Sequence, residues 1–594
     1  MAKSTDRKEG CARWTAVHRA LPAGLAVLCA SFAGVCWSQQ VTDEFRINKV
    51  RVELPASERF ETITFYETDA EGNPRAVLPP SRAAPIDIPP STGRAVPEPF
   101  LEHYGVLLVH AAPGLDRAEL EQVVDRYNRT AGVARRHRAF IGRSSYGNPA
   151  YGSGNVDQIL INEVFVRFKR HTARDRAEAI LRSLGAEIKE TPQNLDEDSY
   201  LVQFPGKPGH VVRGLSNRLD SHEDVEYAQP NFIVIDQRRM PGGLASAGCS
   251  LQCPEDVAAV PAGDPYLKKQ WHLNNLGLVG SFGADVNAFN AWRVTQGDSS
   301  IVVAILDEAI QENHPDLPGT FLTAWSAFEP SPEYECDSVV PGVGNAHGTA
   351  VAGLLAAVHK NGKGVRGIAP GVTVLPVRSH CGLASPLSVV KSAINYAVER
   401  AQVLSMSWSL SGTALDRVEI TNVINQAVQA GKVLVIAADN EGGTFPGVAY
   451  PASLAKTMAV IAVSATDTKD ALQRKSPSCS WTTNSSADTV AAPGVLLYTT
   501  DVTGTGGYCT SGNNSDYVIF DGTSGSTPIV AGIAALMLSM DKELSPAEIR
   551  NRLRLTARHP DPASRPGDAS GWGLGWGRVD ACRALNGEQC MRSP

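Results

Sequence analysis

Short, fully apolar segments alternate with helical patterns between residues 301 and 463, and this alternation constrains the fold more than any other feature. Strands this apolar are buried on both faces, as happens where helices cover both sides of a parallel sheet. The sequence therefore predicts an α/β domain with a doubly wound, mostly parallel sheet and a site at the carboxyl ends of its strands. The predicted strands are Ile301–Leu306, Thr373–Val377, Val403–Met406, Val433–Ala438 and Met458–Val463, and the predicted helices lie near Gly348–Val358, Leu387–Arg400 and Arg417–Ala430.

A second, smaller unit is expected over residues 159–236. Strand and helix patterns follow one another there in the order β-α-β-β-α-β, which predicts a ferredoxin-like α+β unit. Asp175 is expected to cap the helix Arg176–Leu184, which stops at Gly185. Many unrelated proteins share this arrangement, so it says little about function by itself.

The N-terminus has the order of residues that is typical of a secretory signal peptide. A flank with several Lys and Arg residues precedes the apolar run Leu21–Trp37, and small and polar residues follow around Ser38. An uncleaved membrane anchor is the competing interpretation, but the apolar core is shorter than the roughly 20 residues that span a bilayer. We expect residues 1–38 to be removed and the mature protein to be secreted without a membrane attachment.

The eleven cysteines agree with export. Three lie inside residues 1–38, and an even number in the rest of a secreted chain favours disulfide bonds over free thiols. Many pairings are open, although Cys249–Cys253 and Cys582–Cys590 are close enough in sequence to form local pairs. No metal site is predicted, because Cys249 and Cys253 have no second Cys or His pair at zinc-finger spacing.

The overall charge argues against a nucleic-acid partner, since a net charge of −7 and a pI near 6.0 leave no basic surplus. Residues 39–158 include a hairpin-like stretch at Glu61–Leu78 and a proline-rich segment, but no pattern that assigns a function. Residues 237–263 form a linker that is rich in Gly, Ala and Pro. This linker includes Arg238 and Arg239, and we expect maturation cleavage within it.

Three polar side chains stand where catalytic groups are expected. Asp307 directly follows the first predicted strand, although a lone Asp there is as often a loop cap. His347 opens an apolar helix, where the helix dipole disfavours the imidazolium form and so suits a general base. Ser524 precedes the apolar helix Ile529–Met540. The ordinary role of such a serine is that of an N-cap, and its catalytic role is that of a nucleophile beside N–H groups that stabilise an oxyanion.

The segments around these residues resemble the motifs of the subtilisin-like serine proteases, also called subtilases. The chain order Asp, His, Ser is also that of subtilisin, whereas α/β-hydrolases place Ser first. The ending VEYAQPN at Val225–Asn231 resembles the close of the inhibitory propeptides that precede such catalytic domains. The other matching segments, within a resemblance that extends over Asp264–Leu585, are DEAIQENHPDL at Asp307–Leu317, HGTAVAG at His347–Gly353, AADNEG at Ala437–Gly442 and GTSGSTP at Gly522–Pro528.

This resemblance implies a subtilisin-like fold and a secreted serine endopeptidase, with a catalytic triad, an oxyanion-hole donor and a substrate-binding strand. An Asn at the donor position is also a common turn residue, and that alternative stays open. The triad would be Asp307, His347 and Ser524, the donor would be Asn440, and the strand that borders the primary specificity pocket would contain Ser407, Trp408 and Ser409.

The same resemblance implies the partners. Substrates would be proteins or peptides, and the unit at residues 159–236 would serve as an intramolecular chaperone and temporary inhibitor of the catalytic domain, residues 264–588. The chemistry would need no cofactor. A structural calcium ion is common in the family, yet Val358–Gly364 does not repeat the family's Asn-rich calcium loop. We expect a monomer.

Three substitutions depart from the family pattern. Glu308-Ala309 replaces the usual Ser/Thr-Gly after the aspartate, Asp439 replaces the Gly before the oxyanion-hole Asn, and Gly525-Ser526 replaces the common Met-Ala. None of them removes a triad residue, but together they bear on catalytic rate and pH optimum. The alternative function is therefore a catalytically impaired, secreted binding protein with the same fold, a pseudoprotease.

Overall fold

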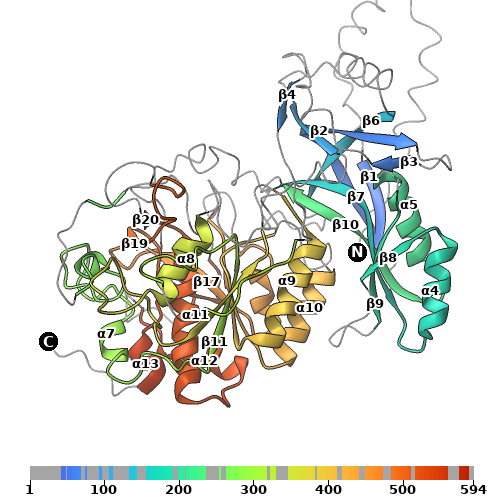
Figure 1. Ribbon diagram of the computed structural model, residues 1–594. Coiled ribbons are helices and arrows are strands. Elements are labelled where there is room, and N and C mark those ends of the chain that lie inside the picture. Colours follow the sequence, from blue (N-terminus) through green and yellow to red (C-terminus); the bar gives the residue numbers. More distant parts are fainter. Residues whose placement is uncertain are drawn as a thin grey trace, which may run out of the picture. The chain divides into compact units, whose positions relative to one another are not determined.

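The computed structural model describes strand segments within residues 42–159 and most of residues 160–586 (Figure 1). Two of the sequence predictions, the signal segment 1–38 and the cleavage site near Arg238 and Arg239, lie outside the described residues. Within 160–586 the described part excludes residues 191–197, 206, 208, 236–252, 256–262, 318–320, 329–345, 381–383, 411–417, 441–447, 473–482, 484, 510–515 and 560–573.

The predicted parallel sheet is present and has seven strands, all of them parallel to their neighbours. The predicted α/β fold class is thereby confirmed. The last of the predicted strands begins at Ile461 and not at Met458, because the preceding residues complete a 3-10 turn over Ala452–Lys456. In spatial order the strands are β12 (Trp325–Ser326), β13 (Thr373–Arg378), β11 (Val302–Asp307), β15 (Val403–Met406), β16 (Val433–Ala437), β17 (Ile461–Thr466) and β18 (Thr489–Pro493).

Helices cover both faces of this sheet, and the alternation of side chains along each strand decides which face a residue supplies (Figure 1). In β11, Val303 and Ile305 pack in the core that contains α8 (His347–Ala356) and α11 (Thr523–Met540). Ala304 and Leu306, on the opposite face, pack in the core that contains α9 (Leu387–Arg400) and α10 (Val418–Gln429). Burial on both faces explains why most residues of the central strands are apolar.

Helix α11 is the one helix in the described part of the chain that is long and apolar enough to cross a membrane by length and composition. Its 18 residues have a mean hydropathy of 1.3, and 83% of them are buried inside the protein. Such burial is what the central helix of a two-sided α/β core requires, so its composition is explained by packing.

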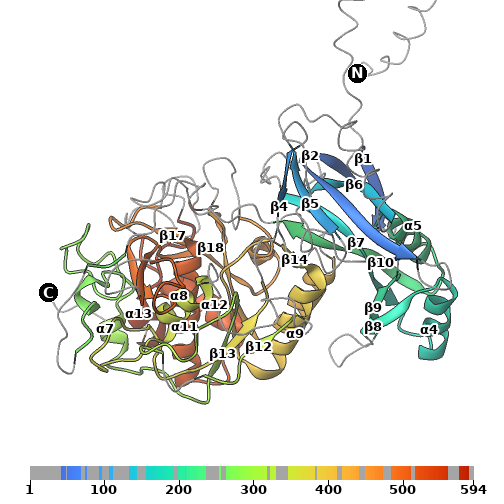
Figure 2. The same cartoon turned by 45° about the horizontal axis from the view of Figure 1, so that its top comes forward.

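The smaller unit has the predicted β-α-β-β-α-β order (Figure 2). Its strands pair in the order β8-β9-β7-β10, and α4 and α5 cover one face. The prediction that Asp175 caps the first helix was wrong: α4 begins at Arg174, two residues earlier than expected, and Asp175 lies in its first turn, where its charge still complements the helix dipole. The elements are β7 (Val156–Phe168), α4 (Arg174–Ser183), β8 (Glu187–Glu190), β9 (Ser199–Gln203), α5 (Gly209–Asp220) and β10 (Val225–Ile235).

Further strands extend this sheet on the N-terminal side. The hairpin-like stretch is a hairpin, since β2 pairs antiparallel with β3 through Tyr66–Thr68 and Pro74–Ala76. On the other side, β10 pairs antiparallel with β14 of the larger domain, with Ile233 opposite Pro386. The added strands are β1 (Thr42–Ile47), β2 (Val50–Thr68), β3 (Pro74–Ala76), β4 (Gly93–Val96), β5 (Val106–Ala111), β6 (Val133–Gly142) and β14 (Ala384–Pro386).

Two further strands and three further helices belong to the larger domain, the first of these helices being α7 (Ala288–Ala291). A two-stranded antiparallel ladder joins β19 (Leu497–Thr500) and β20 (Tyr517–Phe520). Helix α12 (Pro546–Thr556) starts with a capping box between Ser545 and Glu548, which satisfies N–H groups that the helix leaves without partners. The short helix α13 (Ala581–Asn586) follows near the C-terminus.

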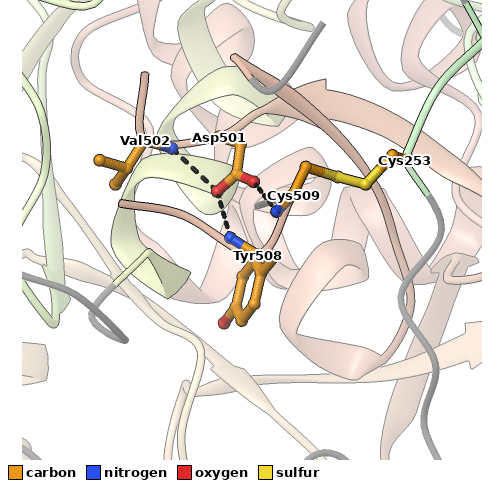
Figure 3. The surroundings of a disulfide bond; sticks show 5 residues. All are labelled: Cys253, Asp501, Val502, Tyr508 and Cys509. Atoms are coloured by element: carbon orange, nitrogen blue, oxygen red, sulfur yellow. Dashed lines mark hydrogen bonds between the residues drawn. A yellow bond between two sulfur atoms is a disulfide. The ribbon is translucent and has the colours of Figure 1, made fainter. Parts of the chain in front are cut away.

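A disulfide bond joins Cys253 to Cys509, which are 256 residues apart in sequence (Figure 3). The local pair Cys249–Cys253 was therefore a wrong prediction. Beside the bond, the carboxylate of Asp501 accepts the backbone N–H groups of Val502, Tyr508 and Cys509, which fixes the loop after β19 (Figure 3). Cys582 is also disulfide-bonded, and the pair with Cys590 stays a prediction because Cys590 lies outside the described residues.

One buried histidine gives the fold a predictable response to acid. His272 is completely buried, neither ring nitrogen has a hydrogen-bond partner in the described structure, and burial lowers its pKa to about 3. In the unfolded chain the same ring binds a proton near pH 6.5, so acid favours the unfolded state as the pH falls below 6.5. The stability that the neutral ring contributes is fully present above pH 6.5 and is lost progressively down to about pH 3.

We therefore expect His272→Phe to remove part of this pH dependence. Between pH 6.5 and 5.0 the histidine should cost about 2 kcal/mol of unfolding free energy, at about 1.4 kcal/mol per pH unit. Urea unfolding of both proteins, each with Ser524→Ala to prevent self-digestion, measures the difference. Parallel losses of stability with and without His272 would contradict the prediction.

Candidate active site

Asp307 is the last residue of β11 and is completely buried. Its Oδ1 accepts the backbone N–H of Glu308 at 2.7 Å and lies 2.7 Å from Nδ1 of His347. Because a carboxylate only accepts hydrogen bonds, this second contact requires the proton on Nδ1 and leaves Nε2 of the neutral ring as an acceptor. The arrangement is that of a general base held by an acid.

His347 is the first residue of α8, and its side chain is 18% exposed. The helix N-cap is Ala346, so a capping role for the histidine does not apply. The next residue, Gly348, has no room for a side chain, because a Cβ atom there would lie 2.7 Å from the carbonyl oxygen of Ala309. The small residue therefore lets the imidazole approach Asp307.

Ser524 is the second residue of α11, and the N-cap of that helix is Gly522, with φ of 121°. The N-cap alternative for Ser524 is thereby excluded. Its Oγ donates to the carbonyl of Ser407 at 3.2 Å, and the hydroxyl of Ser407 donates back to the carbonyl of Ser524 at 3.0 Å. Ser524 is thus tied to the strand end of β15 and lies at the carboxyl edge of the sheet.

Asn440 follows β16, and its side chain is directed at the residue before Ser524. Its Oδ1 accepts both the backbone N–H and the hydroxyl of Thr523, each at 3.0 Å. With Oδ1 so engaged, the amide NH₂ is the group left to donate to a ligand. The sequence singled out Asn440 but missed Thr523, which orients it and which lies inside the same GTSGSTP segment.

Two aromatic contacts complete the link between these segments. The ring of Phe520 packs edge-on against His347, with centroids 5.4 Å apart, four residues before Ser524. The indole N–H of Trp408 donates to the carbonyl of Leu306 at 2.8 Å, one residue before Asp307. The segments that carry the acid, the histidine and the serine are therefore in mutual contact.

The expected substrate-binding residues divide between two faces. Ser407 faces Ser524, whereas Trp408 is only 4% exposed and its ring packs against His380. Ser409 donates its hydroxyl to the carboxylate of Asp439 at 2.8 Å. Trp408 is therefore buried, and Ser407 is the residue of this segment that contacts Ser524 directly.

The substitutions after Asp307 and Ser524 have different consequences. Oδ2 of Asp307 is buried and has no hydrogen-bond partner in the described structure, at the position where the family's hydroxyl would help to hold the carboxylate. By contrast, Gly525 is accommodated by packing, since a Cβ there would lie 2.4 Å from Cδ1 of Leu497. The hydroxyl of Ser526 donates to the carbonyls of Ala492 and Pro493.

The segment Val358–Gly364 does not fit a calcium ion. Calcium takes six to eight oxygen ligands, and here the nearby carboxylates are turned toward N–H donors. Asp264 accepts the N–H of Asn361 and pairs with the guanidinium of Arg366, and Asp316 accepts the amide of Asn361 and a backbone N–H. Burial raises the pKa of Asp316 to about 7. The described residues contain no group of three or more His, Cys, Asp or Glu side chains placed to bind a metal.

Two family models match the chain. The model described as the subtilase family, Peptidase_S8, matches residues 298–577. The model described as the fervidolysin N-terminal prodomain matches residues 155–231. The two matches cover the parallel-sheet domain and the ferredoxin-like unit.

Individual relatives agree with these matches. The chain is 34% identical to thermitase from Thermoactinomyces vulgaris over 304 residues, which cover 50% of this chain and 93% of thermitase. It is 27% identical over 458 residues to a calcium-dependent protease from Trichormus variabilis, covering 72% of this chain and 63% of that protein. The crystal structure of fervidolysin from Fervidobacterium pennivorans is described as that of a keratinolytic enzyme related to subtilisin. It is similar to this protein with a TM-score of 0.53 and 20% sequence identity, over 73% of this chain and 62% of the fervidolysin chain. This likeness supports the fold.

Proposed function

The chain belongs to the subtilase family of serine proteases, and from this premise we propose that Asp307, His347 and Ser524 are its catalytic triad. The observation that carries the proposal is the 2.7 Å hydrogen bond between Asp307 and His347. It is joined by the contact of Phe520 with that imidazole, which brings the Ser524 segment to the histidine. A buried acid, an oriented imidazole and a helix-start serine are the parts that acyl transfer requires.

In the proposed mechanism Ser524 attacks the scissile carbonyl while Nε2 of His347 takes its proton. The hydroxyl turns from the Ser407 carbonyl toward the imidazole for this step. Asp307 keeps the ring in the correct tautomer and stabilises the imidazolium that forms. His347 then gives the proton to the leaving amine, and water hydrolyses the acyl-enzyme by the same route in reverse. The products are two peptides, and no cofactor is consumed.

The amide NH₂ of Asn440 and the backbone N–H of Ser524 would stabilise the oxyanion. We expect Asn440→Ala to lower kcat by about 10²- to 10³-fold with little change in KM, a magnitude measured for such a donor in a subtilisin. Peptide hydrolysis at saturating and at low substrate separates the two constants. A loss confined to KM, or none, would assign Asn440 to the turn instead.

We also propose that the ferredoxin-like unit is an inhibitory propeptide. Its strand β10 pairs with β14, and Tyr227 donates to the buried carboxylate of Glu419 on α10, which also pairs with Lys391 on α9. Asn231 donates to Ser388 at the start of α9. These contacts cover surface of α9 and α10 and pair with β14, so they would hold the propeptide on the catalytic domain and assist its folding.

The remaining proposals concern organisation and location. We propose a signal peptide over 1–38, a pro-region of unassigned role over 39–158, the propeptide over 159–236, a processed linker over 237–263 and a catalytic domain over 264–588. We also propose secretion, which agrees with the extracellular protease among the relatives, and a monomeric state. A calcium-dependent relative makes a structural calcium ion plausible, but it would bind outside Val358–Gly364 and take no part in the chemistry.

Cleavage of a protein substrate tests the proposed function. The processed protein should cut casein at internal bonds and lose that activity after treatment with a fluorophosphonate. N-terminal sequencing of the same preparation locates the signal and maturation cleavages. A processed, folded protein that cuts no substrate and takes up no fluorophosphonate would favour the pseudoprotease.

A further inference from the structure

The Cys253–Cys509 bond joins the expected maturation linker, residues 237–263, to the loop between β19 and β20 (Figure 3). Cys509 is completely buried, and its backbone N–H donates to Oδ2 of Asp501 at 2.8 Å. The other end of the bond is accessible from solvent, because Cys253 is exposed. One residue of the linker is thus covalently fixed to a buried position of the catalytic domain.

Glu255, two residues after Cys253, is held on the same part of the catalytic domain. The hydroxyl of Tyr266 donates to the backbone carbonyl of Glu255 at 3.2 Å. Tyr266 in turn packs against Tyr498 of β19 and Tyr517 of β20, with ring centroids 5.6 Å and 5.3 Å apart. Residues 253–255 therefore lie against the β19–β20 ladder, although they precede the domain boundary proposed at residue 264.

The ferredoxin-like unit cannot form a disulfide bond of its own with the catalytic domain, because residues 37–248 contain no cysteine. Its described contacts with that domain include the pairing of β10 with β14 and the hydrogen bonds of Tyr227 to Glu419 and of Asn231 to Ser388. None of these contacts is covalent. The covalent connection between the two units therefore runs through the linker.

We infer that the Cys253–Cys509 bond decides which cleavage of the linker frees the inhibitor. This inference rests on the proposed function of the ferredoxin-like unit as an inhibitory propeptide. A cut within residues 237–248, which contain both arginines of the linker, precedes both linker cysteines and separates the two units completely. A cut within residues 254–263 hydrolyses one peptide bond but leaves the propeptide attached through Cys253 and its bond to Cys509.

Attachment matters because it makes the rebinding of the propeptide intramolecular. A tethered partner has an effective concentration on the order of millimolar for short connections, so it rebinds at any dilution of the enzyme. A freed propeptide instead dissociates once its concentration falls below its dissociation constant. Proteolysis of the tethering segment, residues 254–263, should therefore leave the enzyme latent, whereas proteolysis of the releasing segment, residues 237–248, should activate it.

The test inserts the recognition sequence of an unrelated, site-specific protease into the full-length precursor with Ser524→Ala, which prevents self-cleavage. One insertion follows Arg239 in the releasing segment, and the other follows Ala259 in the tethering segment. After cutting, size-exclusion chromatography over a dilution series measures how much propeptide leaves the catalytic domain. The protein cut after Ala259 should keep its propeptide at dilutions roughly 10²- to 10⁴-fold beyond those at which the protein cut after Arg239 loses it.

Two controls assign the retention to the bond. A dithiol reduces the bond to two thiols and is itself oxidised to a disulfide, so it should make the protein cut after Ala259 release its propeptide. Cys253→Ala combined with Cys509→Ala should cause the same release without a reductant. Non-reducing gel electrophoresis in detergent compares the same cut proteins without requiring any variant to fold: the parent should run as one band and the double variant as two.

The outcomes separate this inference from the proposed function. Equal release from the two cut proteins without a reductant, or retention of the propeptide in the double cysteine variant, would overturn the inference and leave the protease assignment intact. The propeptide freed by the cut after Arg239 is then added to processed wild-type enzyme during peptide hydrolysis. Failure to inhibit would instead overturn the proposed role of the ferredoxin-like unit, while the tether itself would remain.

Discussion

Ser524→Ala should reduce peptide hydrolysis by about 10⁶-fold, the loss measured when the nucleophile of a subtilisin is removed. The reason is that no other group in the site can form the acyl-enzyme, and the oxyanion-hole donors alone give only weak catalysis. The variant should also accumulate as an unprocessed precursor in which the ferredoxin-like unit remains covalently attached. Gel mobility and N-terminal sequencing of wild type and variant measure this second effect.

The control is Ser526→Ala, two residues further along the same helix. Its hydroxyl donates to two backbone carbonyls and touches no part of the triad, so its loss should cost about 1 kcal/mol of stability and leave processing intact. Processed and fully active Ser524→Ala protein would contradict the assignment of the nucleophile. Equal losses of activity in both variants would point to packing of α11 and not to chemistry.

Asp307→Asn should lower kcat by about 10⁴-fold while the protein stays folded, as the corresponding change does in another triad enzyme. The 2.7 Å contact with Nδ1 of His347 holds the proton on that nitrogen. An amide can donate to Nδ1 and so stabilise the other tautomer, which leaves Nε2 unable to accept the proton of Ser524. The loss should therefore fall on kcat, with KM nearly unchanged.

This second prediction also has a charge-matched control. Asp298→Asn removes a carboxylate at the far end of α11 and should retain the wild-type kcat. Thermal unfolding of Asp307→Asn should show a cooperative transition, which separates lost chemistry from lost structure. A fully folded Asp307→Asn protein with a kcat within tenfold of wild type would show that Asp307 does not orient the base.

Much of the fold was predictable because its signal is local. Five of the seven strands of the parallel sheet, β11, β13, β15, β16 and β17, are short and largely apolar runs that the sequence predicted, whereas β12 and β18 were missed. Strand ends and helix starts together indicated the edge of the sheet at which the segments of Asp307, His347 and Ser524 lie. The sequence predicted the residue types and the edge of the sheet, but not their hydrogen-bond partners.

The features that the sequence missed depend on contacts between distant segments. The Cys253–Cys509 bond spans 256 residues, so only the folded chain reveals it. The hydrogen bond of Ser409 to Asp439 joins two loops that follow neighbouring strands. The sequence showed that Asp439 departs from the family pattern, but it did not show that Asp439 accepts a hydrogen bond from Ser409. The pairing of Asp264 with Arg366 engages a carboxylate near Val358–Gly364. It was likewise not predictable, because the two residues are far apart in the sequence.

Identification of the residue that a fluorophosphonate modifies tests the central claim most directly. The claim is that Ser524 is made nucleophilic by an imidazole that Asp307 orients. Peptide mapping by mass spectrometry of the processed, folded protein should find the adduct on Ser524, and His347→Ala should abolish the labelling. An adduct on another serine, or undiminished labelling of Ser524 in the absence of His347, would contradict the account.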